Sequence, residues 1–235
     1  MSARPEVTGF FEPRTFSIQY VVADPETGKC AIIDPVLDYD EKSGCTGTVQ
    51  ADKLLAFIEG KGYELEWILD THPHADHFSA AQYLKEKTGV KTAIGEKVVD
   101  VQKLWKGIYN WPDFRADFVH DTLFMPDSGT ARADFPGGSS QALWNSIQAI
   151  LALPEETRVF TGHDYQPGGR EPRWESTVAE QKATNIHMSK CKSMDAFKAV
   201  RDARDKTLPM PKLILHALQI NTNGGRLPEP ESNGR

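Results

Sequence analysis

The stretch EWILDTHPHADH, residues 66–77, places three histidines and an aspartate directly after an apolar run. Such a run is typical of a short β-strand, and α/β folds bind their ligands at the carboxyl ends of strands. Residues two apart in an extended chain point to the same side, so His72 and His74 should face one cleft. Asp76 and His77 are expected to open the following helix and to point back into that cleft. Imidazole nitrogens suit Zn²⁺ or Fe²⁺, so the stretch predicts a metal site.

Strands and helices alternate around this stretch. Residues 15–23 and 30–34 are rich in β-branched and aromatic side chains and enclose a turn, which predicts a hairpin. Apolar spacing and a following glycine predict helices elsewhere. The further expected elements are a loop at 36–48, helices at 49–61, 79–88 and 96–109, and strands at 65–70 and 91–95. This alternation indicates a layered α/β domain.

The second half of the chain continues the pattern less regularly. We expect a strand at 118–124, a long loop, and a helix that Ser139 or Ser140 caps and that runs to about Leu151. A strand at 158–162 and helices at 176–188 and 194–206 should follow. Residues 223–235 are polar and rich in Pro and Gly, so the predicted organisation is one domain over 1–222 and a C-terminal tail over 223–235.

Composition narrows the range of partners. The 235-residue chain has a net charge of −6 and no block of Lys and Arg, which argues against a nucleic-acid partner. It has no apolar run long enough to span a bilayer and no targeting pattern at its N-terminus, so no membrane partner is expected. Its three cysteines form no CxxC pair, which favours a reducing, cytoplasmic location.

The histidine stretch also carries a family resemblance. THPHADH (71–77) resembles the signature of the metallo-β-lactamase superfamily, which implies an αββα sandwich of two facing sheets with helices outside. Three more segments, IIDPV (32–36), HDTLFMPDSGTARADFPGG (120–138) and TGHDY (161–165), resemble the persulfide dioxygenase branch. That resemblance implies oxidation of glutathione persulfide by O₂ to sulfite and glutathione at one non-haem Fe²⁺.

The resemblance also implies a set of metal ligands. The iron of the branch would take His72, Asp121 and a histidine from a PGHT-like loop between them. In hydrolase cousins of the glyoxalase II type, which use Zn²⁺ or another divalent ion, His74 would join His72 in a first site. The residues of a second site would be Asp76, His77 and His163, with Asp121 as the bridge.

This chain departs from the pattern because it has no PGH sequence. The only histidine between His77 and Asp121 is His120, and neighbouring strand residues point to opposite faces. We therefore expect an internal deletion, with a junction near residue 117, that removes a ligand and depletes the second sheet of strands. An exposed sheet edge invites pairing with another chain, so lower stability or a homodimer is expected. Three interpretations stay open: a persulfide dioxygenase, a thioester hydrolase, and an inactive truncated relative.

Several residues around the ligands have predicted supporting roles. Arg132 and Asp134 should form an ion pair that positions their loop or the glutathione end of the substrate. Tyr165 is expected to place its hydroxyl near the open metal position, which makes it, with Asp76, a candidate catalytic residue. Arg132 and Tyr165 are the candidate substrate-binding residues. Asp34, Asp134 and Asp164 are expected to support the ligands from behind.

Overall fold

The computed structural model describes residues 4–96, 98, 99, 102, 121–135 and 138–229. Its largest sheet has five strands in the order β1-β2-β3-β6-β8. They are β1 (Glu6–Glu12), β2 (Ser17–Ala23), β3 (Lys29–Ile33), β6 (Glu64–Asp70) and β8 (Lys91–Ile94). The first three run antiparallel, while β6 pairs parallel with β3 and β8. The predicted hairpin is therefore confirmed in β2 and β3.

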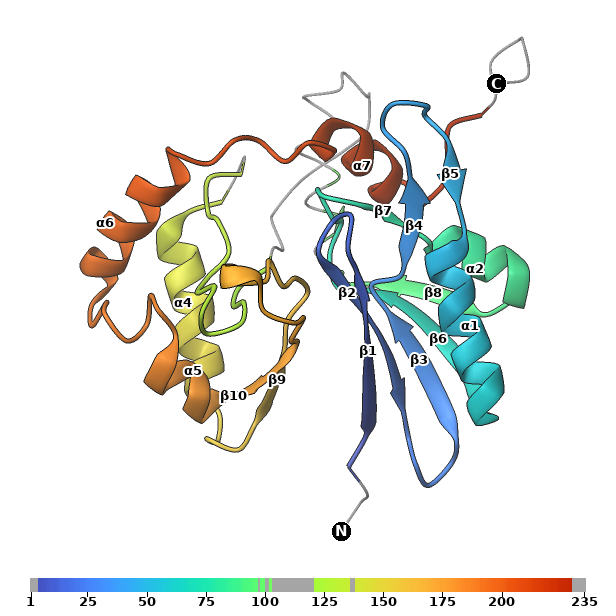
Figure 1. The fold of residues 1–235 in the computed structure, drawn as a ribbon, viewed down its shortest axis with the longest axis horizontal. Coiled ribbons are helices and arrows are strands. Elements are labelled where there is room, and N and C mark those ends of the chain that lie inside the picture. The colour runs from blue at the N-terminus through green and yellow to red at the C-terminus, as the bar shows by residue number, and fades with distance from the viewer. Residues whose placement is uncertain (1–3, 97, 100–101, 103–120, 136–137, 230–235) are drawn as a thin grey trace.

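Two helices pack on the outer face of this sheet (Figure 1). The helix α1 (Val49–Lys61) has the predicted bounds, and α2 (Ala81–Thr88) ends where expected. Each helix is followed by a glycine with positive φ, Gly62 at 67° and Gly89 at 73°, which is a backbone conformation that glycine adopts without strain. Buried side chains of the strands and helices form one continuous apolar core.

The predicted loop at 36–48 is wrong in part, because it contains two strands. A small three-stranded sheet has the order β5-β4-β7, formed by β4 (Val36–Tyr39), β5 (Thr46–Gly47) and β7 (Phe78–Ser79). The rings of Tyr39 and Phe78 stack across it with centroids 4.2 Å apart. Because residues 78–79 pair with β4, the following helix starts at Ala81 rather than at 79. Asp76 and His77 therefore lie in a turn, and the prediction that they open the helix is wrong.

The second half of the described chain builds the opposite layer, apart from its last helix, α7 (Ile214–Asn221), which packs against β7 and the core of the first half. The second half also contains α4 (Ser140–Leu151), β9 (Arg158–Phe160), the short 3₁₀ helix η1 (Pro167–Gly169), β10 (Glu175–Thr177), α5 (Val178–Thr184) and α6 (Met194–Asp205). Ser139 caps α4 as expected, because its hydroxyl accepts a hydrogen bond from the Ala142 amide. The helix expected over 176–188 is shorter, because Glu175–Thr177 pairs with β9 instead.

Two predictions fall partly or wholly outside the described residues. They are most of the helix at 96–109 and the deletion junction near 117. Of the strand expected at 118–124, the described residues 121–124 form only an isolated bridge, between Leu123 and Thr130. This strand is therefore wrong over its described part. The division into a domain and a tail stays a prediction.

The layers form the expected αββα sandwich. In Figure 1, α1 and α2 cover the large sheet on one side, and α4 and α5 lie outside β9 and β10 on the other. The second sheet has two strands within the described residues. Backbone hydrogen bonds join the two sheets, from the Ile18 amide to the Gly162 carbonyl (2.9 Å) and from the Asp164 amide to the Phe16 carbonyl (3.0 Å). We call this junction the seam.

Candidate metal site

The loop that carries the histidines, residues 71–77, follows directly after β6. Hydrogen bonds to Asp34 fix one side of this histidine loop. The Asp34 carboxylate accepts hydrogen bonds from the Thr71 amide (2.7 Å) and the Thr71 hydroxyl (2.9 Å). Asp34 itself has a positive φ of 52°, which turns the chain from β3 into β4 beneath the loop. The structure therefore places Asp34 where it can order the loop.

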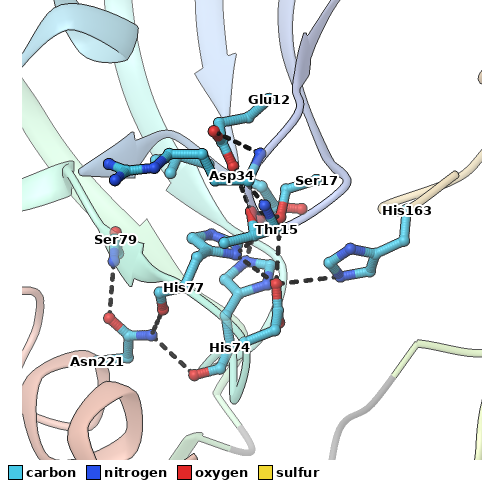
Figure 2. A network of polar contacts seen from close by, with 12 residues as sticks. Glu12, Thr15, Ser17, Asp34, His74, His77, Ser79, His163 and Asn221 are labelled. Atoms are coloured by element: carbon cyan, nitrogen blue, oxygen red, sulfur yellow. Dashed lines mark hydrogen bonds and ion pairs between the residues drawn. The ribbon is translucent and has the colours of Figure 1, made fainter. Parts of the chain in front are cut away.

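Asn221, at the end of α7, fastens the loop on its other side. Its side-chain amide donates hydrogen bonds to the carbonyls of His74 (2.8 Å) and His77 (2.7 Å), and its oxygen accepts one from the Ser79 amide (2.8 Å). Figure 2 shows this amide between the two backbone segments. Sequence reasoning missed Asn221, because it lies far along the chain and belongs to no motif.

Three imidazoles of the loop are packed together and buried. The ring of His74 lies with its centroid 4.1 Å from those of both His72 and His77. The Nε2 atom of His74 is 3.1 Å from Asp34 Oδ1, while Nδ1 of His77 is 2.8 Å from Asp76 Oδ2. Ser17, a residue that sequence reasoning missed, places its hydroxyl 3.1 Å from both Asp76 Oδ2 and His77 Nδ1.

His163 and Asp121 reach the same place from the second half of the chain. Figure 2 shows the His163 ring pointing toward the loop from a separate segment. Its Nε2 atom is 3.4 Å from Asp121 Oδ2 and 3.6 Å from Asp76 Oδ2. Gly162 permits this approach, because a Cβ atom there would lie 2.8 Å from Asp121 Oδ1. The six predicted ligands thus gather at the seam, four from the loop and two from the opposite half.

The chemistry of this set fits a metal ion. Nitrogen atoms of His74 (Nδ1 and Nε2), His77 (Nε2) and His163 (Nδ1) are buried and have no hydrogen-bond partner. Buried polar atoms are normally satisfied, so a cluster of unpartnered imidazole nitrogens suggests donors that a metal ion would take up. For His163, the nitrogen that faces the carboxylates is Nε2. Ligand atoms of His74, Asp76 and His163 all lie within 4.8 Å of one another.

Known proteins place the chain in a family. A sequence profile described as metallo-beta-lactamase superfamily matches residues 14–115. The Glyoxylase B2 of Dictyostelium discoideum is 39% identical over 279 aligned positions, which cover 100% of this chain and 96% of that protein. The chain belongs to the metallo-β-lactamase superfamily.

Two further known proteins are similar to the chain. The Beta-lactamase hydrolase-like protein of Agrobacterium fabrum is 58% identical over 276 positions, which cover 100% of this chain, and the chain spans 64% of its length. The crystal structure of ETHE1 from Myxococcus xanthus has a TM-score of 0.70 at 22% identity and covers 94% of this chain and 100% of that one. At this identity the likeness shows the fold.

Burial and the charges of neighbouring carboxylates shift the pKa values of the candidate histidine ligands in opposite directions. Burial lowers the pKa of His72 to about 4, and the neighbouring His74 adds to the shift. Burial also opposes protonation of His74, but Asp34 outweighs it and raises the pKa of His74 to about 10. Burial would raise the pKa of the Asp76 carboxyl, yet His163 and His77 hold that pKa well below its usual range. The carboxylates of Asp34 and Asp76 therefore stay ionised beside the imidazoles, and a bound cation would compete with a proton for His74.

Arg132 and Asp134 form the ion pair that the sequence predicts. Arg132 binds Asp134 through Nε (2.6 Å) and Nη2 (2.8 Å), and its Nη1 donates to the Pro209 carbonyl (2.7 Å). All three guanidinium nitrogens thus have protein partners, which suits positioning of the loop. A direct contact of Arg132 with substrate stays a prediction.

Asp164 and Tyr165 follow His163 and point in different directions. Asp164 is fully buried and accepts hydrogen bonds from Arg170 Nη1 (2.6 Å), Arg170 Nη2 (2.7 Å) and the Arg173 amide (2.7 Å). Tyr165 is 50% exposed and stacks on the His163 ring, with centroids 5.9 Å apart. Asp164 thereby fixes the loop, and Tyr165 lines the solvent side of the ligand. His120 lies outside the described residues.

No helix within the described residues combines the length and the apolar character needed to cross a membrane.

Proposed function

We propose that the chain binds one Fe²⁺ ion at the seam and converts glutathione persulfide, O₂ and water to sulfite and glutathione. The observation that carries the proposal is the gathering of two imidazoles and one carboxylate, His74, Asp76 and His163, within 4.8 Å. Two histidines and one carboxylate are the ligand set of non-haem Fe²⁺ oxygenases, which leaves positions open for substrate and O₂. When bound, the ion would supply the redox chemistry that transfers oxygen to sulfur.

The protein's own residues would hold and shield the reactants. Tyr165 stacks on His163 and is half exposed, and its hydroxyl would meet a substrate that enters from solvent. Phe124 packs edge-on against both rings, with centroids 6.1 Å from His163 and 5.5 Å from Tyr165, and gives the entrance an apolar wall. A thiol-linked small molecule is the substrate class that such a wall and a single polar hydroxyl would accept.

A second candidate function is hydrolysis of a glutathione thioester with Zn²⁺. It is favoured by the position of Asp121, whose Oδ2 lies 3.4 Å from His163 Nε2 and opposite Asp76. A carboxylate there would suit a bridging ligand, and a metal ion with an open position can activate water for hydrolysis. The names of the two relatives, a glyoxylase and a hydrolase-like protein, point the same way.

We also propose that the chain carries an internal deletion. The alignments with the two relatives run over 276 and 279 positions, whereas the whole chain has 235 residues. The relatives therefore have residues inside the matched range that this chain lacks. A missing segment would account for the absent PGH histidine and for a small second sheet. It also supports the third interpretation, a chain with little or no activity.

An assay with two substrates separates the candidates. The full chain is loaded anaerobically with Fe²⁺ or Zn²⁺ and supplied with glutathione persulfide or S-lactoylglutathione. Oxygen uptake with sulfite release in the Fe²⁺ form supports the dioxygenase, and thioester cleavage in the Zn²⁺ form supports the hydrolase. Asp76→Asn should abolish either activity, whereas the exposed Asp202→Asn should leave it unchanged. No turnover of either substrate would overturn both.

We further propose that the chain self-associates. Trp67, in the middle of β6, is 42% exposed, although large aromatic side chains within a sheet are normally covered. A homodimer that covers this face would bury it. Sedimentation velocity should show a dimer that Trp67→Glu dissociates, and a wild-type monomer would contradict this proposal.

A further inference from the structure

We propose that His74, rather than His72, is the loop histidine that completes the metal site, in a set with Asp76 and His163. The inference rests on the proposed function in one respect, the presence of a metal ion at the seam. It changes the expected ligand set, because the family pattern assigns the iron to His72, Asp121 and a histidine that this chain lacks. The two ligands that remain of that pattern cannot make a triad.

The first observation is proximity. Ligand atoms of His74, Asp76 and His163 lie within 4.8 Å of one another, a separation that one ion can bridge. The Nε2 atom of His163 is 3.6 Å from Asp76 Oδ2, and both histidines are almost completely buried. Within the described residues, His72 belongs to no such group of three.

The second observation is the orientation of the His74 ring. One nitrogen, Nε2, lies at ion-pair distance from Asp34 Oδ1 (3.1 Å), and both ring nitrogens are buried without a hydrogen-bond partner. Histidines that bind metals usually present their second nitrogen to a carboxylate, which fixes the ring and makes it a stronger ligand. The Thr71 amide donates a hydrogen bond to Asp34, and the Asn221 side chain donates one to the His74 carbonyl. The His74 ring is therefore oriented before an ion binds.

His72 lacks this support. Its Nδ1 atom lies 2.9 Å from the Thr71 hydroxyl, a neutral group in the adjacent residue. A hydroxyl orients an imidazole but adds no negative charge behind it. The difference between the two histidines is therefore the carboxylate of Asp34, which lies behind His74.

A rival location uses the same histidine. Ligand atoms of Asp34, Asp70 and His74 also lie within 4.8 Å of one another. There, however, the Asp34 carboxylate already accepts two hydrogen bonds from Thr71, and the Ser79 hydroxyl shares its one proton between the two oxygens of the Asp70 carboxylate. One imidazole with two engaged carboxylates is also a poorer set for Fe²⁺ or Zn²⁺ than two imidazoles with one carboxylate.

A comparison of two neighbouring histidines tests the proposal. Apo protein is titrated anaerobically with Fe²⁺, and separately with Zn²⁺, for wild type, His74→Ala and His72→Ala, with ions per chain counted by mass spectrometry. We expect one ion per wild-type chain. His74→Ala should lower metal affinity by at least ~100-fold, since even supporting residues of a metal site alter affinity by about 10–100-fold. His72→Ala should change metal affinity by less than ~3-fold. Asp76→Asn should lose the ion, and Asp70→Asn should retain it.

Each other outcome has a definite meaning. Equal losses in both histidine variants, or a loss confined to His72→Ala, would overturn the proposal. A loss in Asp70→Asn with binding retained in Asp76→Asn would place the ion at the rival location and also overturn it. A wild-type chain that binds no ion would instead overturn the proposed function. If His74→Ala fails to fold, the visible spectrum of Co²⁺-loaded His72→Ala decides: a wild-type spectrum supports the proposal, and an altered one contradicts it.

Discussion

The two halves of this sandwich differ in how much structure surrounds their part of the metal site. The first half has five paired strands, two covering helices and one continuous apolar core. The second half has the two-stranded sheet of β9 and β10 within the described residues, and a separate, smaller core beneath α4 and α6. The first half holds the loop of four candidate ligands, and the second supplies Asp121 and His163. A metal ion at the seam would therefore join the half with the larger sheet and core to the half with the smaller ones.

The largest expected effect separates the two cores. Ile68 in β6 and Ile147 in α4 are both fully buried, one in each core. Replacement of either by alanine should cost about 2–5 kcal/mol of local stability, because it leaves a cavity. Hydrogen exchange read by mass spectrometry should show Ile147→Ala deprotecting α4 and α6 alone, while Ile68→Ala deprotects β3 and β6.

That contrast can fail in one clear way. If Ile147→Ala deprotects the five-stranded sheet as strongly as Ile68→Ala does, the two halves unfold as one unit. The comparison between them would then have no energetic meaning.

The next effect concerns the support of the histidine loop. Asn221→Ala removes three hydrogen bonds, to the backbones of His74, His77 and Ser79, in a buried position. Unpartnered buried groups should lower the free energy of unfolding by about 1–3 kcal/mol, as measured by urea denaturation. Zinc affinity should fall by about 10–100-fold. The exposed Asn223→Ala is the matched control, and a similar change there would refute the role of Asn221.

A smaller effect is expected from a hydrogen bond across the seam. The Tyr20 hydroxyl donates to the Thr161 carbonyl in a buried position. Tyr20→Phe should lower the free energy of unfolding by about 1 kcal/mol. Tyr63→Phe removes an exposed hydrogen bond to Glu6 within the first half, and should change it by less than about 0.5 kcal/mol. If both variants change the free energy of unfolding equally, in thermal or urea unfolding, the hydrogen bond across the seam contributes no more to stability than an exposed one.

The smallest effect is a pH dependence in the second half. Burial, followed by the charge of Arg201, lowers the pKa of His187 to about 4, and its Nδ1 accepts a hydrogen bond from the Thr130 amide (3.2 Å). The unfolded chain therefore binds more protons between about pH 6.5 and 4, so this contribution to stability is lost as pH falls through that window. In apo protein, the stability difference between wild type and His187→Asn should shrink over that range. A constant difference would contradict the assignment.

Local signals explain which parts of the fold the sequence could predict. The helix bounds at Lys61 and Thr88 follow from the glycines after them, and β6 follows from an unbroken apolar run. The strand β1 was missed, as were β4, β5 and β7. The strands β4 and β7 depend on partners distant in sequence, as in the pairing of Val36 with Ser79, and short segments carry too little pattern to reveal such a partner. The strand β1 pairs with the neighbouring β2 and was missed although its partner is close in sequence.

The candidate site shows the same limit. The motif identified all six candidate ligands, because their residue types and spacing lie within short segments. It could not identify Asn221 or Ser17, whose roles come from contacts across the fold. The family resemblance assigned iron to His72 and left His74 as the substitute for the missing histidine, because spacing says nothing about which imidazole has a carboxylate behind it.

The central claim is that one ion joins the two halves at the seam. The most direct test is metal content per chain by native mass spectrometry, on protein prepared without oxygen and supplied with both iron and zinc. The account predicts one ion per chain, iron or zinc, and its removal by a chelator should lower protection from hydrogen exchange in the segments that carry both His74 and His163. Two ions per chain, no ion, or an ion whose removal leaves the His163 segment unchanged would contradict it.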